Sequence, residues 1–555
     1  MTSSFKTTGE SSWAGSDPAG VAVGTIDSLR PARSRTLRAI LRRAFSFPVL
    51  LAGLLVAGVF VGTRLNLWDP DTWWHIRVGQ KILAEGKWPA TDPFSFTVSG
   101  NDWMAYEWLG EVLMGFSTRW GWLVGPTVLL IGLSASFMLL LHYYACLRSG
   151  NVKAAFVACA LVLPLAQAFF SLRPQLLGYN FLLVTLICLE HCRRGRRRLV
   201  WLLPILFLVW VNTHGTFIFG LLVLGLFWAG GLVEFHKGGL VAERWTPSQR
   251  RQLALVLLLC LLVLPLTPYG TRLAAYPLVM SLSQPVNVAN IQEWQPPFGL
   301  FMGKFLLGLL LAFFLAQVIS PLKYRLEEAA LLLFAAYAAC VHLRFVCLFL
   351  LVFTPLLAAS LARWIPAYQA AKDHFVLNAA LLAMVAVGLV AFFPSDRQLQ
   401  KLAEERYPLK AVEYLRSHPL RGRMLNEYGW GGYLIWALSP EHKVFIDGRA
   451  DIYEYAGVLS DYLSIVRLEP RTLPLLRTYG IESCLIPRKA PLETFLAALP
   501  DWERVYADDV SVLFVRKQAP LAGRAAGSEN GMGATNLSKG RHLEGTRASQ
   551  GAWAP

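Results

Sequence analysis

The chain has 555 residues, of which 55% are hydrophobic and only 16% are charged, whereas a soluble domain carries about 25% charged residues. A mean hydropathy of +0.44 and apolar runs such as residues 253–266 exclude an ordinary soluble enzyme, because no single core could bury so much apolar surface. The formal charge of +16 would suit nucleic-acid binding, but membrane topology uses basic residues too, and we expect no nucleic-acid partner.

The apolar runs predict a polytopic α-helical membrane protein with about eleven transmembrane helices, within a range of about ten to twelve, since each span needs about 20 mostly apolar residues. Residues 1–45 are polar and basic and predict a disordered cytoplasmic tail, and residues 46–393 form the transmembrane domain. Several runs are short, so tilting or local thinning of the bilayer is expected. The spans are predicted near residues 48–64, 122–147, 154–171, 175–191, 199–212, 215–235, 253–266, 300–320, 329–341, 345–361 and 375–393.

The basic residues predict the orientation of these spans. With a cytoplasmic N-terminus, the inward segments hold about 21 basic residues and the outward segments before residue 394 hold about nine, as the positive-inside rule requires. We interpret the RRGRRR cluster at residues 193–198 as a topogenic signal. The sequence thus predicts a multi-pass protein of an inner or plasma membrane, in contact with membrane lipid, whose C-terminal end is extracytoplasmic.

Two outward segments are too large to be simple connections, and function is expected there. The first, residues 65–121, contains two amphipathic stretches, 73–85 and 103–116, rich in Trp. The second, residues 394–519, has the composition of a small soluble α/β domain. Its pattern predicts helices at 409–417 and 492–499 and strands at 443–447, 481–487, 502–508 and 510–517. Residues 520–555 lack periodic apolar positions and predict a disordered tail.

The motif LWDPDTWWH follows the first span and places Asp69 and Asp71 at the outer membrane surface. Such carboxylates can act as a general base or bind a divalent metal ion, Mg or Mn, and burial beside aromatic rings raises a carboxyl pKa toward neutrality. An alternative interpretation makes Asp71 a helix N-cap. No cofactor other than such an ion is expected.

The same loop carries His75, Asp92 and Glu107 as further candidates for substrate contacts. Glu107 and Glu111 are four residues apart and share one helix face. A solvated helix face explains the glutamates about as well as catalysis does, and Asp92 before Pro93 is also a good turn former.

Three short outward turns carry isolated cations, Arg173, His214 and Arg344. Outward positive charge opposes the topology rule and calls for compensation. A phosphate group is one candidate, because guanidinium binds it in a bidentate way; lipid headgroups and the loop carboxylates are alternatives. In the outward loop at 267–297, Glu293 and Trp294 are placed for an acceptor or sugar contact, although an aromatic belt also explains Trp294.

The segments 426–436 (NEYGWGGYLIW) and 445–453 (FIDGRADIY) stand out in the C-terminal part. Their Gly clusters predict turns, and Asp447, Arg449 and Asp451 are expected to pair with one another.

With DPDTWWH, the loop pattern that follows and the large C-terminal outward domain, the chain resembles the GT-C superfamily of integral membrane glycosyltransferases, in a bacterial branch. That superfamily includes protein mannosyltransferases, aminoarabinose transferases and oligosaccharyltransferases. The resemblance implies a polyprenyl-phosphate-linked sugar as donor and, by position, Asp69 and Asp71 as the acidic catalytic site. Arg173, Arg344 and His214 would then face the donor phosphate. The acceptor, a lipid, glycan or protein outside the cytoplasm, is not identified, and no acceptor motif such as WWD is matched.

Two other classes of function remain open. A lipid or solute transporter would carry ionisable residues at the bilayer midplane and paired broken helices, of which the sequence shows almost none. A non-catalytic sensor or assembly protein would use the C-terminal domain as a binding module and would not require Asp69 and Asp71.

Overall fold

The computed structural model describes residues 32–67, 69–282, 284–420 and 422–517. The tail expected at 1–45 lies outside the described residues up to residue 31, and the tail expected at 520–555 lies outside them altogether. Residues Ala32–Ala44, which the sequence assigned to the tail, form helix α1, since Arg, Leu and Ala are good helix formers.

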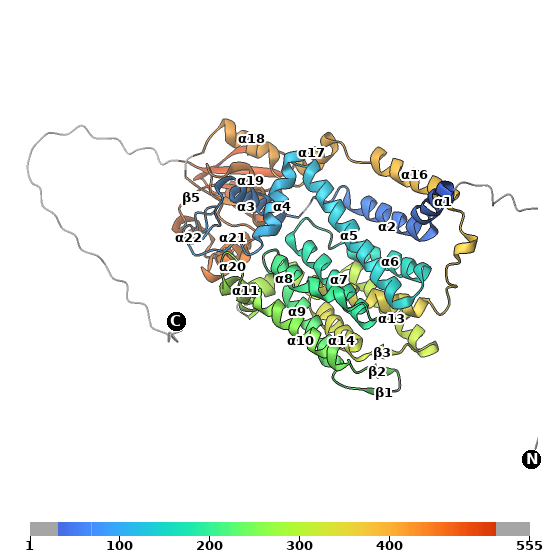
Figure 1. Ribbon diagram of the computed structural model, residues 1–555. Helices are drawn as coiled ribbons and strands as arrows, with labels where there is room; N and C mark the ends of the chain where they lie inside the picture. The colour runs from blue at the N-terminus through green and yellow to red at the C-terminus, as the bar shows by residue number, and fades with distance from the viewer. Residues whose placement is uncertain (1–31, 68, 283, 421, 518–555) are drawn as a thin grey trace, which may run out of the picture.

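A helix lies in each of the eleven stretches predicted to span the membrane (Figure 1). Among the described residues, five helical segments are long and apolar enough to cross a bilayer, or six if α16 and α17 (Asp396–Glu404), bent by 57°, form one span. The chain is a multi-pass membrane protein, but the number of about eleven spans is not confirmed, because helices such as α8 have only 9 residues. The eleven helices are α2 (Phe47–Thr63), α5 (Val124–Ser149), α6 (Val152–Gln167), α7 (Pro174–Arg193), α8 (Leu203–Val211), α9 (Phe217–Gly230), α10 (Pro247–Leu262), α13 (Phe301–Ile319), α14 (Leu326–Val341), α15 (Val346–Leu361) and α16 (Phe375–Ala391).

Helix α15 forms the centre of the bundle. Its side chains are buried almost without interruption from Val346 to Ser360, and it packs against α5, α6 and α14. A helix that is apolar on all sides is expected in such a central place.

The first loop (residues 65–121) folds into two packed helices, α3 (Asp71–Glu85) and α4 (Trp108–Ser117), followed by the 3-10 turn η2 (Thr118–Trp120). Both predicted amphipathic stretches are therefore helical. Gly79 and Gly115 let the two backbones approach closely, since an added Cβ on Gly79 would lie 1.8 Å from the Glu111 carbonyl oxygen.

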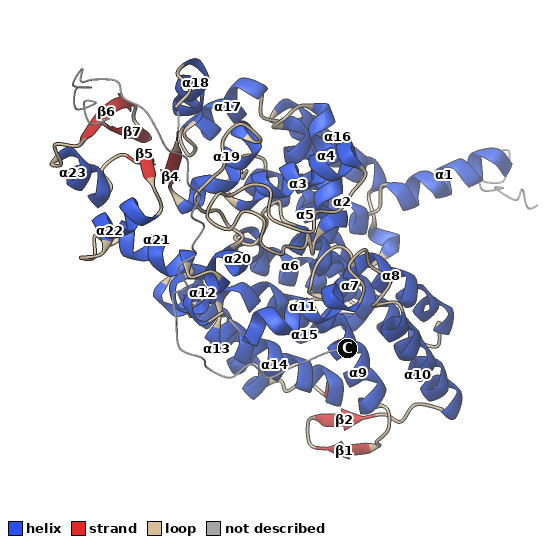
Figure 2. Ribbon diagram, turned by 90° about the vertical axis from the view of Figure 1, so that its left-hand side faces the viewer, coloured by secondary structure: helices blue, strands red, loops and turns tan. Residues whose placement is uncertain are grey.

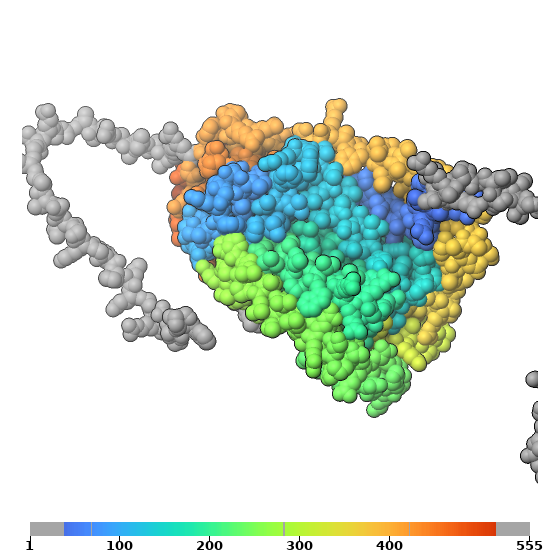
Figure 3. Space-filling view, viewed as in Figure 1, coloured from blue at the N-terminus to red at the C-terminus, as the bar shows by residue number. Residues whose placement is uncertain are grey.

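The tryptophans of α3 are buried inside the protein, although the sequence favoured a membrane-interface belt for them. Trp73 is 1% exposed and packs against the rings of Tyr407, Tyr433 and Trp436. These ring contacts anchor the first loop to the C-terminal region (residues 394–517). Figure 3 shows the surface of the first loop, in blue, directly beside that of the C-terminal region, in orange.

The C-terminal region holds a four-stranded sheet of order β4-β5-β7-β6, in which β4 is parallel to β5 and the other neighbours are antiparallel. The predicted strands at 481–487, 502–508 and 510–517 are confirmed. Residues 443–447 are extended but join no sheet; instead Val444 forms a bridge with Ser95 of the first loop. The elements are α18 (Leu409–Ser417), β4 (Arg423–Asn426), η8 (Tyr428–Trp430), α19 (Gly431–Leu438), α20 (Ala450–Tyr455), α21 (Val458–Val466), α22 (Thr472–Thr478), β5 (Ile481–Pro487), α23 (Pro491–Ala497), β6 (Trp502–Ala507) and β7 (Ser511–Arg516).

The end of the bundle remote from this sheet carries the strands β1 (Phe235–Lys237), β2 (Leu240–Ala242) and β3 (Tyr324–Arg325) (Figure 2). Ion pairs join its segments, among them Arg148 with Glu328 and Arg325 with Glu190. The connections at this end of the bundle were all predicted to face the cytoplasm. The structure therefore groups at one end the connections that the sequence assigned to one side of the membrane. The remaining short elements are α11 (Thr271–Leu282), α12 (Pro285–Asn290), η3 (Arg197–Leu202), η4 (Gln292–Trp294), η5 (Pro297–Gly299), η6 (Leu343–Phe345) and η7 (Ala370–Lys372).

Candidate active site

A cavity of about 120 Å³, called the pocket below, lies between the first loop, the C-terminal region and the helix connections at the same end of the bundle. The connections that line it follow α6, α8, α12 and α14, and all were predicted to share one side of the membrane. Of the site residues predicted from the sequence, the pocket lining brings together Asp71, His75, Glu107, Arg173, His214, Glu293, Trp294 and Arg344.

Arg173 is the centre of charge on one wall. Its guanidinium lies 2.6 Å from an Asp69 oxygen, 2.9 Å from Asp71 and 2.8 Å from Glu293. The loop carboxylates therefore compensate this outward cation, which was one of the alternatives open from the sequence. Three carboxylates around one guanidinium leave an excess of negative charge, which protonation of one of them reduces.

Of the three carboxyl groups, Asp71 is the one that we expect to be protonated. Burial raises the pKa of Asp71 to about 7, against the attraction of Arg173, and the charges of Asp69 and Glu293 raise it further. Asp71 does not cap α3, because Pro70 occupies the N-cap position without a side-chain hydrogen bond. Its Oδ1 instead accepts a hydrogen bond from Trp74 Nε1 at 3.1 Å, while Asp69 Oδ1 accepts from the Asp71 backbone N–H.

A chain of buried carboxyl and imidazole groups forms a second wall. His75 lies between two glutamates, with Nδ1 3.1 Å from Glu111 Oε1 and Nε2 3.4 Å from Glu107 Oε2. His214 Nε2 lies 3.1 Å from the other Glu107 oxygen. The Thr216 backbone N–H donates to His214 Nδ1, so a neutral His214 carries its proton on Nε2, the nitrogen that faces Glu107.

His75 Nδ1 shares a hydrogen bond with Glu111, whereas Nε2 faces Glu107 at ion-pair distance only. Burial lowers the pKa of His75 well below its usual value and raises that of Glu111 well above it. Burial thus favours the neutral forms of both His75 and Glu111, which share the hydrogen bond at His75 Nδ1. Burial also raises the pKa of Glu107 to about 8, against the effect of Arg173, so this carboxyl exchanges protons near neutral pH.

Arg344 is the second cation of the pocket, and its environment differs from that of Arg173. Its guanidinium lies over the Trp294 ring, 4.2 Å from the centroid. In the part of the chain that the structure describes, no carboxylate lies within ion-pair distance of it. Arg344 thus faces the pocket without a direct ion pair from that part of the chain, while its charge, from a distance, adds to that of Arg173 in lowering the pKa of Glu293.

The C-terminal region supplies lining residues that the sequence did not single out as site residues, namely Tyr428, Gly448, Ala450 and Asp451. Asp451 accepts a hydrogen bond from Tyr276 of α11, and burial raises its pKa to about 6. It was expected to pair with Asp447 and Arg449, but only those two pair with each other. The FIDGRAD motif, which contains Gly448, Ala450 and Asp451, was the sequence feature that could have pointed to these lining residues.

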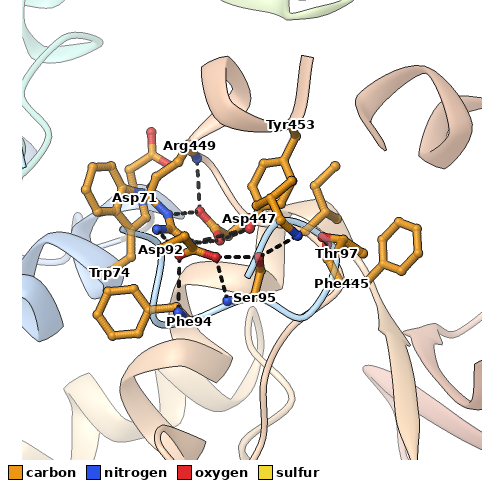
Figure 4. A network of polar contacts seen from close by, with 12 residues as sticks. Asp71, Trp74, Asp92, Phe94, Ser95, Thr97, Phe445, Asp447, Arg449 and Tyr453 are labelled. Atoms are coloured by element: carbon orange, nitrogen blue, oxygen red, sulfur yellow. Dashed lines mark hydrogen bonds and ion pairs between the residues drawn. The ribbon is translucent and has the colours of Figure 1, made fainter. Parts of the chain in front are cut away.

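Asp92 does not line the pocket. It is fully buried and binds Arg449 of the C-terminal region, with Arg449 Nη1 2.6 Å from Asp92 Oδ1 (Figure 4). Its Oδ1 and Oδ2 also accept hydrogen bonds from the backbone N–H groups of Phe94 and Ser95. Asp92 is thus a turn former, as the alternative interpretation held, and also one half of a buried ion pair.

The expected Mg or Mn site at Asp69 and Asp71 does not fit the donor set around them. Both carboxylates bind Arg173, and among the described residues no three His, Cys, Asp or Glu side chains are grouped so that they could hold a metal ion. No step below is therefore assigned to a metal.

The fold and the pocket define a multi-pass membrane protein with a buried site of carboxyl groups and arginines. No family model and no curated protein sequence matches the chain. Several solved structures are similar to it, and three of them are described here. The archaeal oligosaccharyltransferase AglB from Archaeoglobus fulgidus, in complex with an inhibitory peptide and a dolichol-phosphate, is 11% identical over 82% of this chain and 70% of its own, with a TM-score of 0.48.

ArnT from Cupriavidus metallidurans bound to undecaprenyl phosphate is 15% identical over 86% of this chain and 99% of its own, with a TM-score of 0.44. A second A. fulgidus oligosaccharyltransferase structure, a complex with Zn and sulfate, is 12% identical over 81% and 69%, with a TM-score of 0.43. With identities of at most 15% and TM-scores of at most 0.48, these similarities assign neither a superfamily nor an activity to this chain. Similarity at this level assigns no role to any residue of the pocket.

Proposed function

We propose that the protein is a glycosyltransferase that moves a sugar from a polyprenyl-phosphate donor to an acceptor on the extracytoplasmic side of a bacterial membrane. The observation that carries the proposal is that one pocket at the end of a membrane-spanning bundle holds both Asp71, with a pKa near 7, and Arg344, whose guanidinium forms no direct ion pair among the described residues. The donor class follows from the resemblance to the GT-C superfamily.

In this proposal Asp71 is the general base. It accepts the proton of an acceptor hydroxyl or amine while the nucleophile forms a bond to the anomeric carbon and the bond from that carbon to the phosphate oxygen breaks. A positioned base contributes roughly 10²- to 10⁴-fold. With a pKa of about 7, Asp71 has both forms present at neutral pH.

The leaving polyprenyl phosphate gains negative charge, and Arg344 is the group that stabilises it. A cation placed where charge develops in the transition state contributes a few kcal/mol, on the order of 3 kcal/mol for one donor. Arg173 also lines the pocket and is already held by Asp69, Asp71 and Glu293. Its role is to fix Asp71 in place and to supply the second positive charge near the phosphate.

His214 and Glu107 line the same pocket and are suited to contact the sugar or the acceptor. The Trp294 ring, covered on one face by Arg344, orients that arginine. Residues 394–517 then form the extracytoplasmic domain that covers the pocket.

Membranes that contain the full chain test the proposal with a panel of labelled polyprenyl-phosphate sugars and endogenous acceptors. Sugar transfer by the wild type should fall at least about 100-fold in Asp71→Asn, the loss expected for a general base. Asp102→Asn is the matched control, because Asp102 lies in the same loop but is exposed and paired with Arg272 at the surface. Equal transfer in wild type and Asp71→Asn, at equal protein level, would remove Asp71 from the mechanism; no transfer across the panel would contradict the function.

A further inference from the structure

The turn formed by residues 447–451 lies directly against the proposed catalytic carboxyl. A Cβ added to Gly448 would lie 1.6 Å from Asp71 Oδ1 and 3.2 Å from Trp74 Nε1. Gly448 has no positive φ, so lack of space and not backbone conformation excludes a larger residue there. The backbone of this turn is therefore one wall of the pocket.

Arg449 holds the turn through a fully buried ion-pair network (Figure 4). Within the turn, Asp447 accepts hydrogen bonds from Arg449 Nε at 2.8 Å and Nη2 at 2.7 Å, and from Tyr453. Across to the first loop, Arg449 donates to Asp92 and stacks on Trp103, 4.7 Å from the ring centroid. Burial by itself would raise the pKa of Asp92, but Arg449 and the hydrogen bonds hold that pKa below its usual value.

A short backbone pairing supports the same contact. The Val444 backbone N–H donates to the Phe94 carbonyl at 3.0 Å, and the Phe96 N–H donates to the Val444 carbonyl at 3.1 Å. Thr97 Oγ1 donates to the Phe445 carbonyl. The strand-like segment before the turn and the first loop are thus joined by both backbone and side chains.

We propose that the turn at residues 447–451 closes the pocket over Asp71 and that Arg449, bridging Asp447 and Asp92, is the positioning residue that keeps it closed. The inference rests on the proposed function, because closing the pocket matters for a sugar transfer with which hydrolysis of the donor by water competes. In an open pocket a water molecule replaces the acceptor: its oxygen bonds to the anomeric carbon, the bond to the phosphate oxygen breaks, and its proton passes to Asp71. Closure favours transfer over this hydrolysis.

The first test compares Gly448→Ala with Gly429→Ala in full-length protein in membranes. A Cβ on Gly429 would meet only Pro70, at an ordinary 3.9 Å, so it is a matched control in the same region. Gly448→Ala should lower kcat for transfer on the order of 100-fold, as small misplacements at a reacting centre do, and should raise the ratio of free sugar released to sugar transferred. Gly429→Ala should match the wild type in both.

The second test changes the positioning residue. Arg449→Met should raise the hydrolysis ratio as Gly448→Ala does, and Arg449→Lys should recover part of the loss, because Lys restores the charge without the bidentate geometry. Asp92→Asn combined with Arg449→Met should cost less than the sum of the single changes. A purely structural role would lower the amount of folded protein without changing the ratio of hydrolysis to transfer.

Hydrogen exchange of residues 69–75 gives a readout that does not depend on the reaction. It should be faster in Gly448→Ala than in the wild type and in Gly429→Ala, because the covering turn no longer fits. Unchanged exchange together with unchanged ratios would overturn the closure proposal and leave the glycosyltransferase proposal standing. If the wild type transfers no sugar but exchange responds as expected, the proposed function fails and the closure is supported.

Discussion

Two arginines of the pocket differ in what surrounds them, and this difference predicts different effects of substitution. Arg173 is held by three carboxylates, whereas Arg344 faces the pocket from above Trp294. Arg344→Gln should raise KM for the lipid-linked donor about 10- to 100-fold, the loss expected for a hydrogen bond to a charged group. Steady-state kinetics with varied donor would measure this, with the exposed Arg272→Gln as control. Unchanged KM together with unchanged kcat would place the phosphate elsewhere, since stabilisation of the leaving phosphate in the transition state appears in kcat.

The raised pKa of Asp71 predicts how transfer depends on pH. A general base must be deprotonated to act, so kcat/KM should rise with pH and level off above about 7, the pKa that burial gives Asp71. Asp69 contributes to this shift by charge repulsion, so Asp69→Asn should move the rise to lower pH. A pH–rate profile of the two proteins tests this, and a rise at the same pH in both would contradict it.

The raised pKa of Glu111 predicts that the stability of the fold depends on pH. Here the protonated carboxyl is the favourable form, whereas catalysis by Asp71 needs the deprotonated one. Its folded pKa is raised well above the usual value by burial, so its protonated form stabilises the fold at low pH and this stabilisation is lost as pH rises through the folded pKa. Glu111→Gln keeps a donor for His75 without an ionisable group. Thermal unfolding in detergent should show the variant gaining on the wild type, by roughly 1–3 kcal/mol, as pH rises. A loss of stability that is independent of pH would show that Glu111 is ionised in the folded protein.

At the scale of elements, the packing of α3 on α4 decides where the carboxyl and imidazole groups meet. Gly79→Ala would push a methyl group into the Glu111 carbonyl oxygen and separate His75 from both glutamates. Transfer should fall about 10- to 100-fold, measured beside Gly132→Ala. Gly132 in α5 has nothing within 4 Å of an added Cβ, so that variant should be as stable as the wild type or more stable. Equal activity in both variants would show that the helix spacing is not critical.

The same elements show what the sequence could and could not predict. Periodicity located α3, α4 and three strands of the C-terminal sheet, because each buries one regular face. It misassigned residues 443–447, which are apolar and extended but pair with Phe94 and Phe96 of the first loop and not with another strand. It also favoured a membrane belt for Trp73, whose neighbours Tyr433 and Trp436 lie about 360 residues later in the chain. Local pattern contains no information about such contacts.

At the scale of the whole molecule, much of the candidate site was predicted from the orientation that the basic residues give to the membrane spans. The loop motif and the charge rule placed Asp71, Arg173, His214 and Arg344 on one side, and the structure brings them into one pocket. Gly448 and Asp451 were missed as site residues, because only the docking of the C-terminal region places them there.

Orientation itself can be tested by labelling with a membrane-impermeant thiol reagent in intact cells. The eight native cysteines are buried or partly buried, so the background should be low. A cysteine at Arg272, exposed at the pocket end, should react from outside, and one at Lys237 in β1, at the other end, should react only after the membrane is opened. The reverse pattern would place the pocket in the cytoplasm.

The pairing of Asp92 with Arg449 joins positions 357 residues apart in the chain, which has a consequence for biosynthesis. At a translation rate of about 5–20 residues per second, roughly 20 to 70 s pass between synthesis of the two partners. Throughout that interval Asp71 stands uncovered at the membrane surface, already attached to an inserted helix. A ribosome-bound chain should therefore bind lipid-linked substrate before it can use it productively, and the last domain to emerge switches the protein on.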